Sequence, residues 1–88
     1  MGIIKKAAAG LGIPPEAAFD LARIEVCGRE RVTVENYRRL LTYTDKVIAL
    51  DCRKNVAEIA GEGLSIAKMT ADMVFISGRI ETVSLKNV

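Results

Sequence analysis

The stretch VTVENYRRLLTYTDKVIAL, Val32–Leu50, decides the fold of this chain. Apolar and polar residues alternate over Val32–Glu35, the pattern breaks at a polar, basic bend, and it resumes with Leu41 and Tyr43. After a Thr-Asp turn the alternation returns and continues to Leu50. Period-two alternation bounded by Asn, Asp and Thr is typical of half-buried strands joined by turns. The stretch therefore predicts a β-sheet.

The same pattern extends to both sides of this stretch. Ile24–Val26 alternates with charged residues and leads into a turn at Gly28–Glu30. Further along, Val56–Ala60 and Leu64–Ile66 flank Gly61–Gly63, which we expect to be a tight hairpin turn, because glycine supplies the positive φ that such turns need. Both segments read apolar-x-apolar-x-Gly, a turn, and apolar-x-apolar. This echo is consistent with a duplicated hairpin or with convergence on hairpin chemistry, and two copies are too few to establish a solenoid.

The C-terminal segment carries a change of phase. Val74, Ile76 and Ile80 share one face of a strand, whereas Val83 and Leu85 have the opposite parity. We therefore predict that the strand bends, bulges or crosses to another sheet within residues 78–82, where an interior glycine is the natural place for it.

Residues 1–20 differ in character from the rest of the chain. Ile3, Ile4, Ala7, Ala8 and Leu11 fall at helical spacing, Gly10 and Gly12 close the segment, and a Pro-Pro pair follows, which predicts a short N-terminal helical arm. This arm is either a packed end of the domain or an amphipathic hook for a membrane surface or a partner. Over residues 21–88 we expect an all-β domain of about seven to eight short, mostly antiparallel strands, in a small sandwich or β-roll.

The composition limits the function. The chain has 88 residues, 50% of them hydrophobic, no His and a net charge of +2. A domain of this size is marginally stable alone, so docking or self-association is expected. Without His the commonest general base and metal ligand are missing, and the strand carboxylates point outward. We therefore expect no enzyme activity, no metal and no cofactor, and the charge is too low for a dedicated nucleic-acid binder.

The sequence shows no targeting or membrane-spanning segment. The N-terminus lacks the apolar core of a signal peptide and no stretch is long enough to span a membrane, so we expect a cytoplasmic protein with reduced thiols. Cys52 shares its phase with core residues and is expected in the core, whereas Cys27 is out of phase; the sequence leaves open whether the two lie together.

Basic residues gather at turns, either as solvated charges or as a rim for an anionic partner. They are Arg29, Arg31, Arg38, Arg39, Lys46, Arg53 and Lys54.

Several motifs, in order and with natural spacing over residues 21–85, resemble the YabP/YqfC family of sporulation proteins. They are Arg23-Ile24 and Gly28, Val34-Glu35-Asn36, Tyr43-Thr44-Asp45, Gly61 with Leu64-Ser65-Ile66, and a close that runs from Val74 to Val83. The leading Leu-Gly-Ile-Pro and the length are closer to the YqfC branch. The chain departs from the family pattern where Ala22 stands in place of a common Pro, and where Tyr37-Arg38-Arg39 replaces the usual His-Lys-Gly.

The resemblance implies a non-enzymatic protein of endospore formation. It would be made in the mother-cell compartment, close to the forespore membrane, and would act through protein–protein assembly with a membrane protein of the same programme, similar to YqfD. A homo-oligomer through edge strands is a further expectation. The alternative is a peripheral membrane or anionic-polymer binder that uses the basic bend and the N-terminal arm.

The candidate interaction residues cluster in the central stretch. Asn36 can cap a turn through its side chain, and Glu35 can bind a backbone N–H or an arginine. Each candidate also has a purely structural interpretation as a turn-forming residue. The full set is Glu35, Asn36, Arg38, Arg39, Tyr43 and Asp45.

Overall fold

The computed structural model describes residues 20–87. The helix predicted within residues 1–20 lies outside this range, apart from Asp20, which occupies a turn. The described residues form six antiparallel strands in one sheet of order β1-β2-β6-β5-β4-β3. The strands are β1 (Arg23–Cys27), β2 (Arg31–Glu35), β3 (Arg39–Tyr43), β4 (Val47–Asp51), β5 (Asn55–Met69) and β6 (Met73–Asn87).

The all-β prediction is confirmed for the described residues, but the predicted count of seven to eight short strands is not. Four strands have five residues each, whereas β5 and β6 have fifteen each. These two strands pair along their length and continue through the positions where shorter strands were expected to end. The long β5–β6 hairpin is therefore the frame of the domain.

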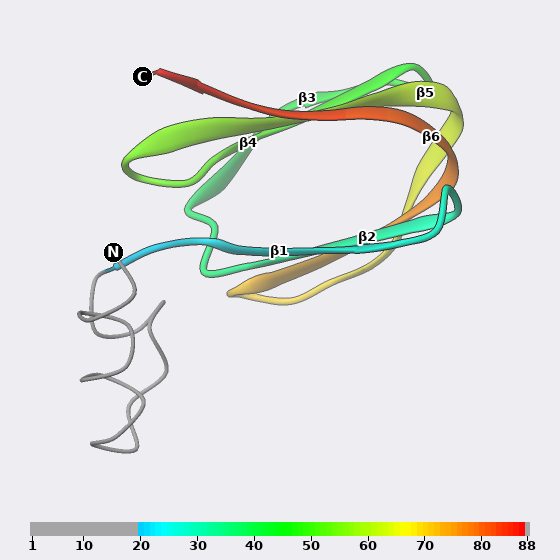
Figure 1. Ribbon diagram of the computed structural model, residues 1–88. Helices are drawn as coiled ribbons and strands as arrows, with labels where there is room; N and C mark the ends of the chain where they lie inside the picture. Colours follow the sequence, from blue (N-terminus) through cyan, green and yellow to red (C-terminus); the bar gives the residue numbers. More distant parts are fainter. Residues whose placement is uncertain (1–19, 88) are drawn as a thin grey trace.

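This hairpin folds over on itself, so that its two halves belong to two facing layers (Figure 1). The first half of β6 pairs with β2, which pairs with β1. The first half of β5 pairs with β4, which pairs with β3. One layer thus contains β1 and β2, the other contains β3 and β4, and both are completed by β5 and β6.

Glycines mark the two bends. The pairing of β5 with β6 shifts register beside Gly61 and again opposite Gly78, and Gly78 has a φ of 136°. The bend predicted within residues 78–82 is therefore confirmed. The hairpin turn predicted at Gly61–Gly63 is wrong, because β5 passes through these residues without reversing. The duplicated hairpin fails for the same reason: of the two segments compared, Gly28–Glu30 is a turn between paired strands and Gly61–Gly63 is not.

Both short hairpins attach their turns to a bend of the long one. The N–H groups of Gly61 and Leu64 donate to the carbonyl oxygens of Lys46 (3.0 Å) and Asp45 (2.8 Å) in the β3–β4 turn. On the other side, the N–H groups of Gly78 and Ile80 donate to Glu30 (3.1 Å) and Arg29 (2.7 Å) in the β1–β2 turn. The two halves of the domain therefore have the same plan: a short hairpin whose turn is hydrogen-bonded to a bend of the long one.

The core lies between the two layers and is built from the inward-facing positions of β2, β4, β5 and β6. Burying a Val, Leu or Ile side chain contributes about 1.5–3 kcal/mol each relative to exposure. In β3 a bulge reverses the expected phase: Leu40 packs against the core, and Leu41 is 47% exposed. The aliphatic core residues are Val32, Val34, Ile48, Leu50, Ala57, Ile59, Leu64, Val74, Ile76 and Ile80.

Replacing the bend glycines should destabilise the fold strongly. A Cβ on Gly61 would overlap the carbonyl oxygen of Arg79, and a Cβ on Gly78 would lie 2.7 Å from the carbonyl oxygen of Gly63. We expect Gly61→Ala and Gly78→Ala each to lower the free energy of unfolding by at least about 2 kcal/mol, measured by urea titration with far-UV circular dichroism.

Gly28→Ala is the matched control. Gly28 also has a positive φ, of 58°, but nothing lies within 4 Å of an added Cβ. It should therefore cost only the backbone strain of about 1–2 kcal/mol. Equal losses in all three variants would contradict the close backbone approach at the bends.

Candidate interaction site

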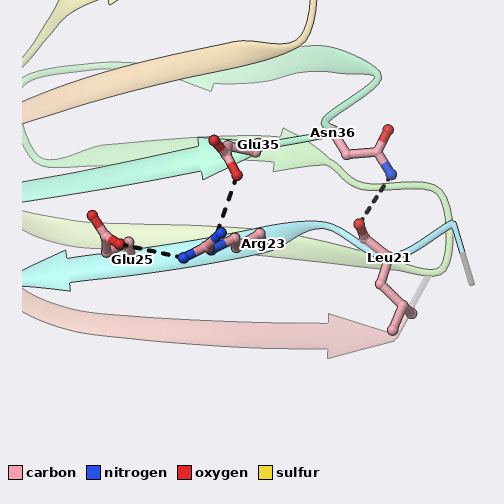
Figure 2. Close-up of polar contacts among 5 residues, drawn as sticks. All are labelled: Leu21, Arg23, Glu25, Glu35 and Asn36. Carbon is pink, nitrogen blue, oxygen red and sulfur yellow. Dashed lines mark hydrogen bonds and ion pairs between the residues drawn. The ribbon is translucent and has the colours of Figure 1, made fainter. Parts of the chain in front are cut away.

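Asn36 forms a sharp corner at the end of β2. It has a φ of 63°, which Asn tolerates better than most residues. Its backbone N–H donates to the carbonyl oxygen of Asp72 (2.7 Å), and its side-chain amide donates to the carbonyl oxygen of Leu21 (3.0 Å). Figure 2 shows the amide directed at the segment that leads into β1. Asn36 therefore ties three segments of the backbone together.

Glu35 lies beside this corner on the outer face of the sheet. Arg23 lies between two carboxylates, at 3.7 Å from Glu25 and 4.0 Å from Glu35 (Figure 2). Arg23 and Glu25 are largely exposed and Glu35 is partly exposed, and ion pairs near the surface contribute about 0–1 kcal/mol. The arrangement is a row of surface charges across two neighbouring strands.

Tyr37, which is not among the candidate interaction residues, is buried at the same end of the molecule. Its hydroxyl donates to the carbonyl oxygen of Thr70 in the β5–β6 turn at 2.7 Å. The aromatic ring joins the core cluster, and the hydroxyl is paired at its edge. The position where the family pattern usually has His is thus filled by a structural residue.

The basic bend is organised by Asp51, the one buried charged residue among those described. Its carboxylate accepts the N–H of Arg53 at 3.0 Å and pairs with the Arg39 guanidinium at 3.4 Å. Its backbone oxygen accepts the N–H of Arg38 at 2.7 Å. Asp51 therefore brings Arg38 and Arg39 next to the turn that carries Arg53 and Lys54.

Tyr43 and Asp45 lie away from these residues, beyond the other end of β3. The Tyr43 hydroxyl accepts the N–H of Ile66, at 3.0 Å, on the open edge of β5. Thr44 stabilises the predicted turn, because its hydroxyl accepts the N–H of Val47 at 2.9 Å. The six predicted residues therefore do not form one site: four surround the Asn36 corner and the basic bend, and two serve the far turn.

A groove that the sequence did not reveal lies between the start of β1 and the end of β6. It has a volume of about 200 Å³ and is mainly apolar. The exposed fraction of Leu85 at its rim is 59%, the largest among the exposed large apolar side chains of the described residues. The groove is lined by Leu21, Ala22, Ile24, Cys52, Lys54, Asn55 and Leu85.

Cys52 belongs to the wall of this groove but is almost completely buried, at 1% exposure, which confirms its predicted place in the core. Burial raises the pKa of its thiol, and the nearby Asp51 carboxylate adds to this, while a backbone hydrogen bond with Ala57 opposes it. Cys27 is exposed, and both thiols are free. Within residues 20–87 no group of three or more His, Cys, Asp or Glu residues could hold a metal ion.

Two variants of Asn36 should separate its structural role from a binding role. Asn36→Gly keeps the positive φ but loses the bond to Leu21, so we expect a loss of about 1 kcal/mol in the free energy of unfolding. Asn36→Ala loses the bond to Leu21 and also strains the backbone at the positive φ, so it should lower the free energy of unfolding by about 2–3 kcal/mol. Thermal or urea unfolding measures both variants, with the partly exposed neighbour Glu35→Ala as the control. Unchanged stability in both would show that Asn36 is not a structural corner.

The two thiols should differ in reactivity. With Ellman's reagent at neutral pH, Cys27 should react at once and Cys52 only on unfolding, because burial and a raised pKa both reduce its accessible thiolate. The folded state also holds the Cys52 proton more tightly than the unfolded chain does. Stability should therefore fall as the pH rises above the ordinary thiol range, and Cys52→Ala should lose this part of the pH dependence. Rapid labelling of Cys52 in a Cys27→Ser variant would contradict this.

No helix in the described part of the chain is long and apolar enough to cross a membrane. No solved structure matches this chain. The curated protein named "Uncharacterized protein YqfC", from Bacillus subtilis (strain 168), is 30% identical over 73 residues, which are 83% of this chain and 78% of that protein. The sequence profile of the YabP family matches residues 20–88, which covers the whole of the β domain. The chain therefore belongs to the YabP family.

Proposed function

We propose that this protein is a non-enzymatic component of endospore formation that acts by binding another protein through its strand edges. The observation that carries the proposal is the open edge beside the groove. Within residues 20–87, β1 pairs only with β2, and the last part of β6 pairs only with β5. Edge strands with exposed apolar side chains are ready sites for pairing with another chain.

Membership of the YabP family fits a role related to sporulation, and this family is not a known enzyme family. We place the protein in the mother-cell cytoplasm, close to the forespore membrane, with a membrane protein similar to YqfD as its partner. A homo-oligomer through the same edges is a second mode of assembly. A small domain gains stability from such an interface, because a partner that binds only the folded state shifts the folding equilibrium toward it.

One observation favours the second candidate function, a peripheral membrane or anionic-polymer binder. Arg38 and Arg39 meet the turn of Arg53 and Lys54 around Asp51, so basic residues far apart in sequence share one end of the domain. Two of these charges are already engaged by carboxylates: Arg39 by Asp51, and Arg53 by Asp20 at 3.2 Å. This neutralisation makes the basic end a weaker candidate than the open strand edge.

Deletion of the gene in its own host tests the proposed function. We expect a lower yield of heat-resistant spores with unchanged vegetative growth, and rescue by the wild-type chain. In extracts of sporulating cells, the tagged protein should copurify with a membrane protein in high salt, because pairing of strand edges does not depend on exposed charges. A normal spore yield would overturn the proposal.

The second candidate predicts a different result. Association would then be with vesicles that contain phosphatidylglycerol, would be released by salt, and would be weakened by Arg38→Glu. Arg79→Glu is the matched control, since it reverses an exposed cation at the β6 bend, beside the opposite turn. If the protein binds such vesicles and no other protein copurifies with it, membrane attachment is its function and protein–protein assembly is not.

A further inference from the structure

The two seams where the layers meet are unequal. At the seam between β3 and β5, the Tyr43 hydroxyl accepts the N–H of Ile66 and bridges the gap. At the seam between β1 and β6, the N–H of Ile80 reaches the Arg29 carbonyl oxygen near the bend. Beyond that point, no hydrogen bond within the described range joins β1 to β6, and the groove occupies the space. One seam is closed, and its counterpart is open.

The open seam has the features of a site for an extended chain. Along Thr82–Asn87, the side of β6 that faces away from β5 carries backbone groups with no partner in the described structure. Leu85 and Ile24 line the groove from the two layers, and Val26, further along β1, is 49% exposed. A strand added to β6 would use this free edge and place every second side chain toward the groove.

The charge at the end of the groove is positive. Lys54 lines the groove and forms no ion pair within residues 20–87. Arg53, its neighbour, is held by Asp20 at 3.2 Å. A carboxylate on the bound segment would complement Lys54, and a basic residue there would be repelled.

We propose that this groove binds an extended, acidic and apolar segment of a partner protein, paired with the free edge of β6. Apolar side chains at alternate positions fill the groove, and an acidic side chain lies beside Lys54. The free edge favours a polypeptide over a lipid, because an acyl chain cannot pair with backbone N–H and C=O groups. This inference rests on the proposed function and specifies its contact surface.

Selection from a displayed library of random dodecapeptides on the immobilised full chain tests the proposal. The enriched peptides should alternate apolar residues and carry at least one Asp or Glu. By fluorescence anisotropy, their affinity should fall about tenfold or more with Leu85→Glu and with Lys54→Glu, because each variant removes a favourable contact and places a negative charge next to an acidic peptide. An N-methylated version of the best peptide, which cannot pair with a strand edge, should also lose affinity.

Matched variants guard against general effects. Leu41→Glu changes an apolar side chain of β3 that is 47% exposed, and Arg79→Glu reverses a cation beside the β1–β2 turn. Both should bind the peptides as the wild type does. Circular dichroism melts establish whether each variant is folded. If Leu85→Glu does not fold, Lys54→Glu, which changes an exposed position between β4 and β5, tests the groove in its place.

Four results would overturn the proposal. They are enrichment of no peptide, peptides whose binding survives Leu85→Glu, binding of phosphatidylglycerol vesicles in place of peptides through the same residues, and a dimer in sedimentation that Leu85→Glu dissociates. Complementation of the deletion strain with the Leu85→Glu variant tests the groove separately from the sporulation role. If the deletion strain has a spore defect and folded Leu85→Glu rescues it fully, the sporulation role stands and the groove is not its contact surface.

Discussion

The fold depends on the close approach of backbones where β5 and β6 bend. At these points a Cβ on Gly61 would overlap a carbonyl oxygen of the partner strand, and a Cβ on Gly78 would lie 2.7 Å from one, so no other residue fits without moving the chain. The bends let one long hairpin supply both layers, and every other strand is added to one of its halves. The turn carbonyls of Arg29, Glu30, Asp45 and Lys46 then satisfy N–H groups that the register shifts release.

This plan explains why the domain has open edges despite its small size. A sheet that folds over once brings four strand edges to its two seams, and each seam needs its own means of protection. One seam has Tyr43, a long side chain with a polar tip that accepts a backbone N–H. At the other seam the groove is lined by the aliphatic side chains of Ile24 and Leu85, which cannot replace a backbone partner. The difference between the seams, rather than the basic bend, distinguishes the surface that we propose for binding.

The sequence predicts those features that depend on local pattern. Alternation identified β1, β2 and β4, and the phase change between Ile80 and Val83 located the bend of β6. The hairpin turn predicted at Gly61–Gly63 is wrong because two glycines suit a turn and a bend equally, and the choice is made by pairing with Arg79 and Ile80 of β6. Among the candidate residues, Asn36 has a positive φ and forms a corner at the end of β2. The groove could not be predicted, because its walls come from residues 21–24, 52–55 and 85, which meet only after the sheet has folded.

The departures of this chain from the family pattern acquire a physical meaning in the structure. Tyr37 replaces a His and seals one end of the core, with its hydroxyl on the Thr70 carbonyl oxygen. Arg39 replaces a Gly and pairs with the buried Asp51, which also fixes the Cys52–Lys54 turn at the end of the groove. Arg39 thus contacts Asp51, and Asp51 in turn holds the turn that forms part of the groove wall. The bend therefore supports the wall of the proposed binding surface from a position outside the groove.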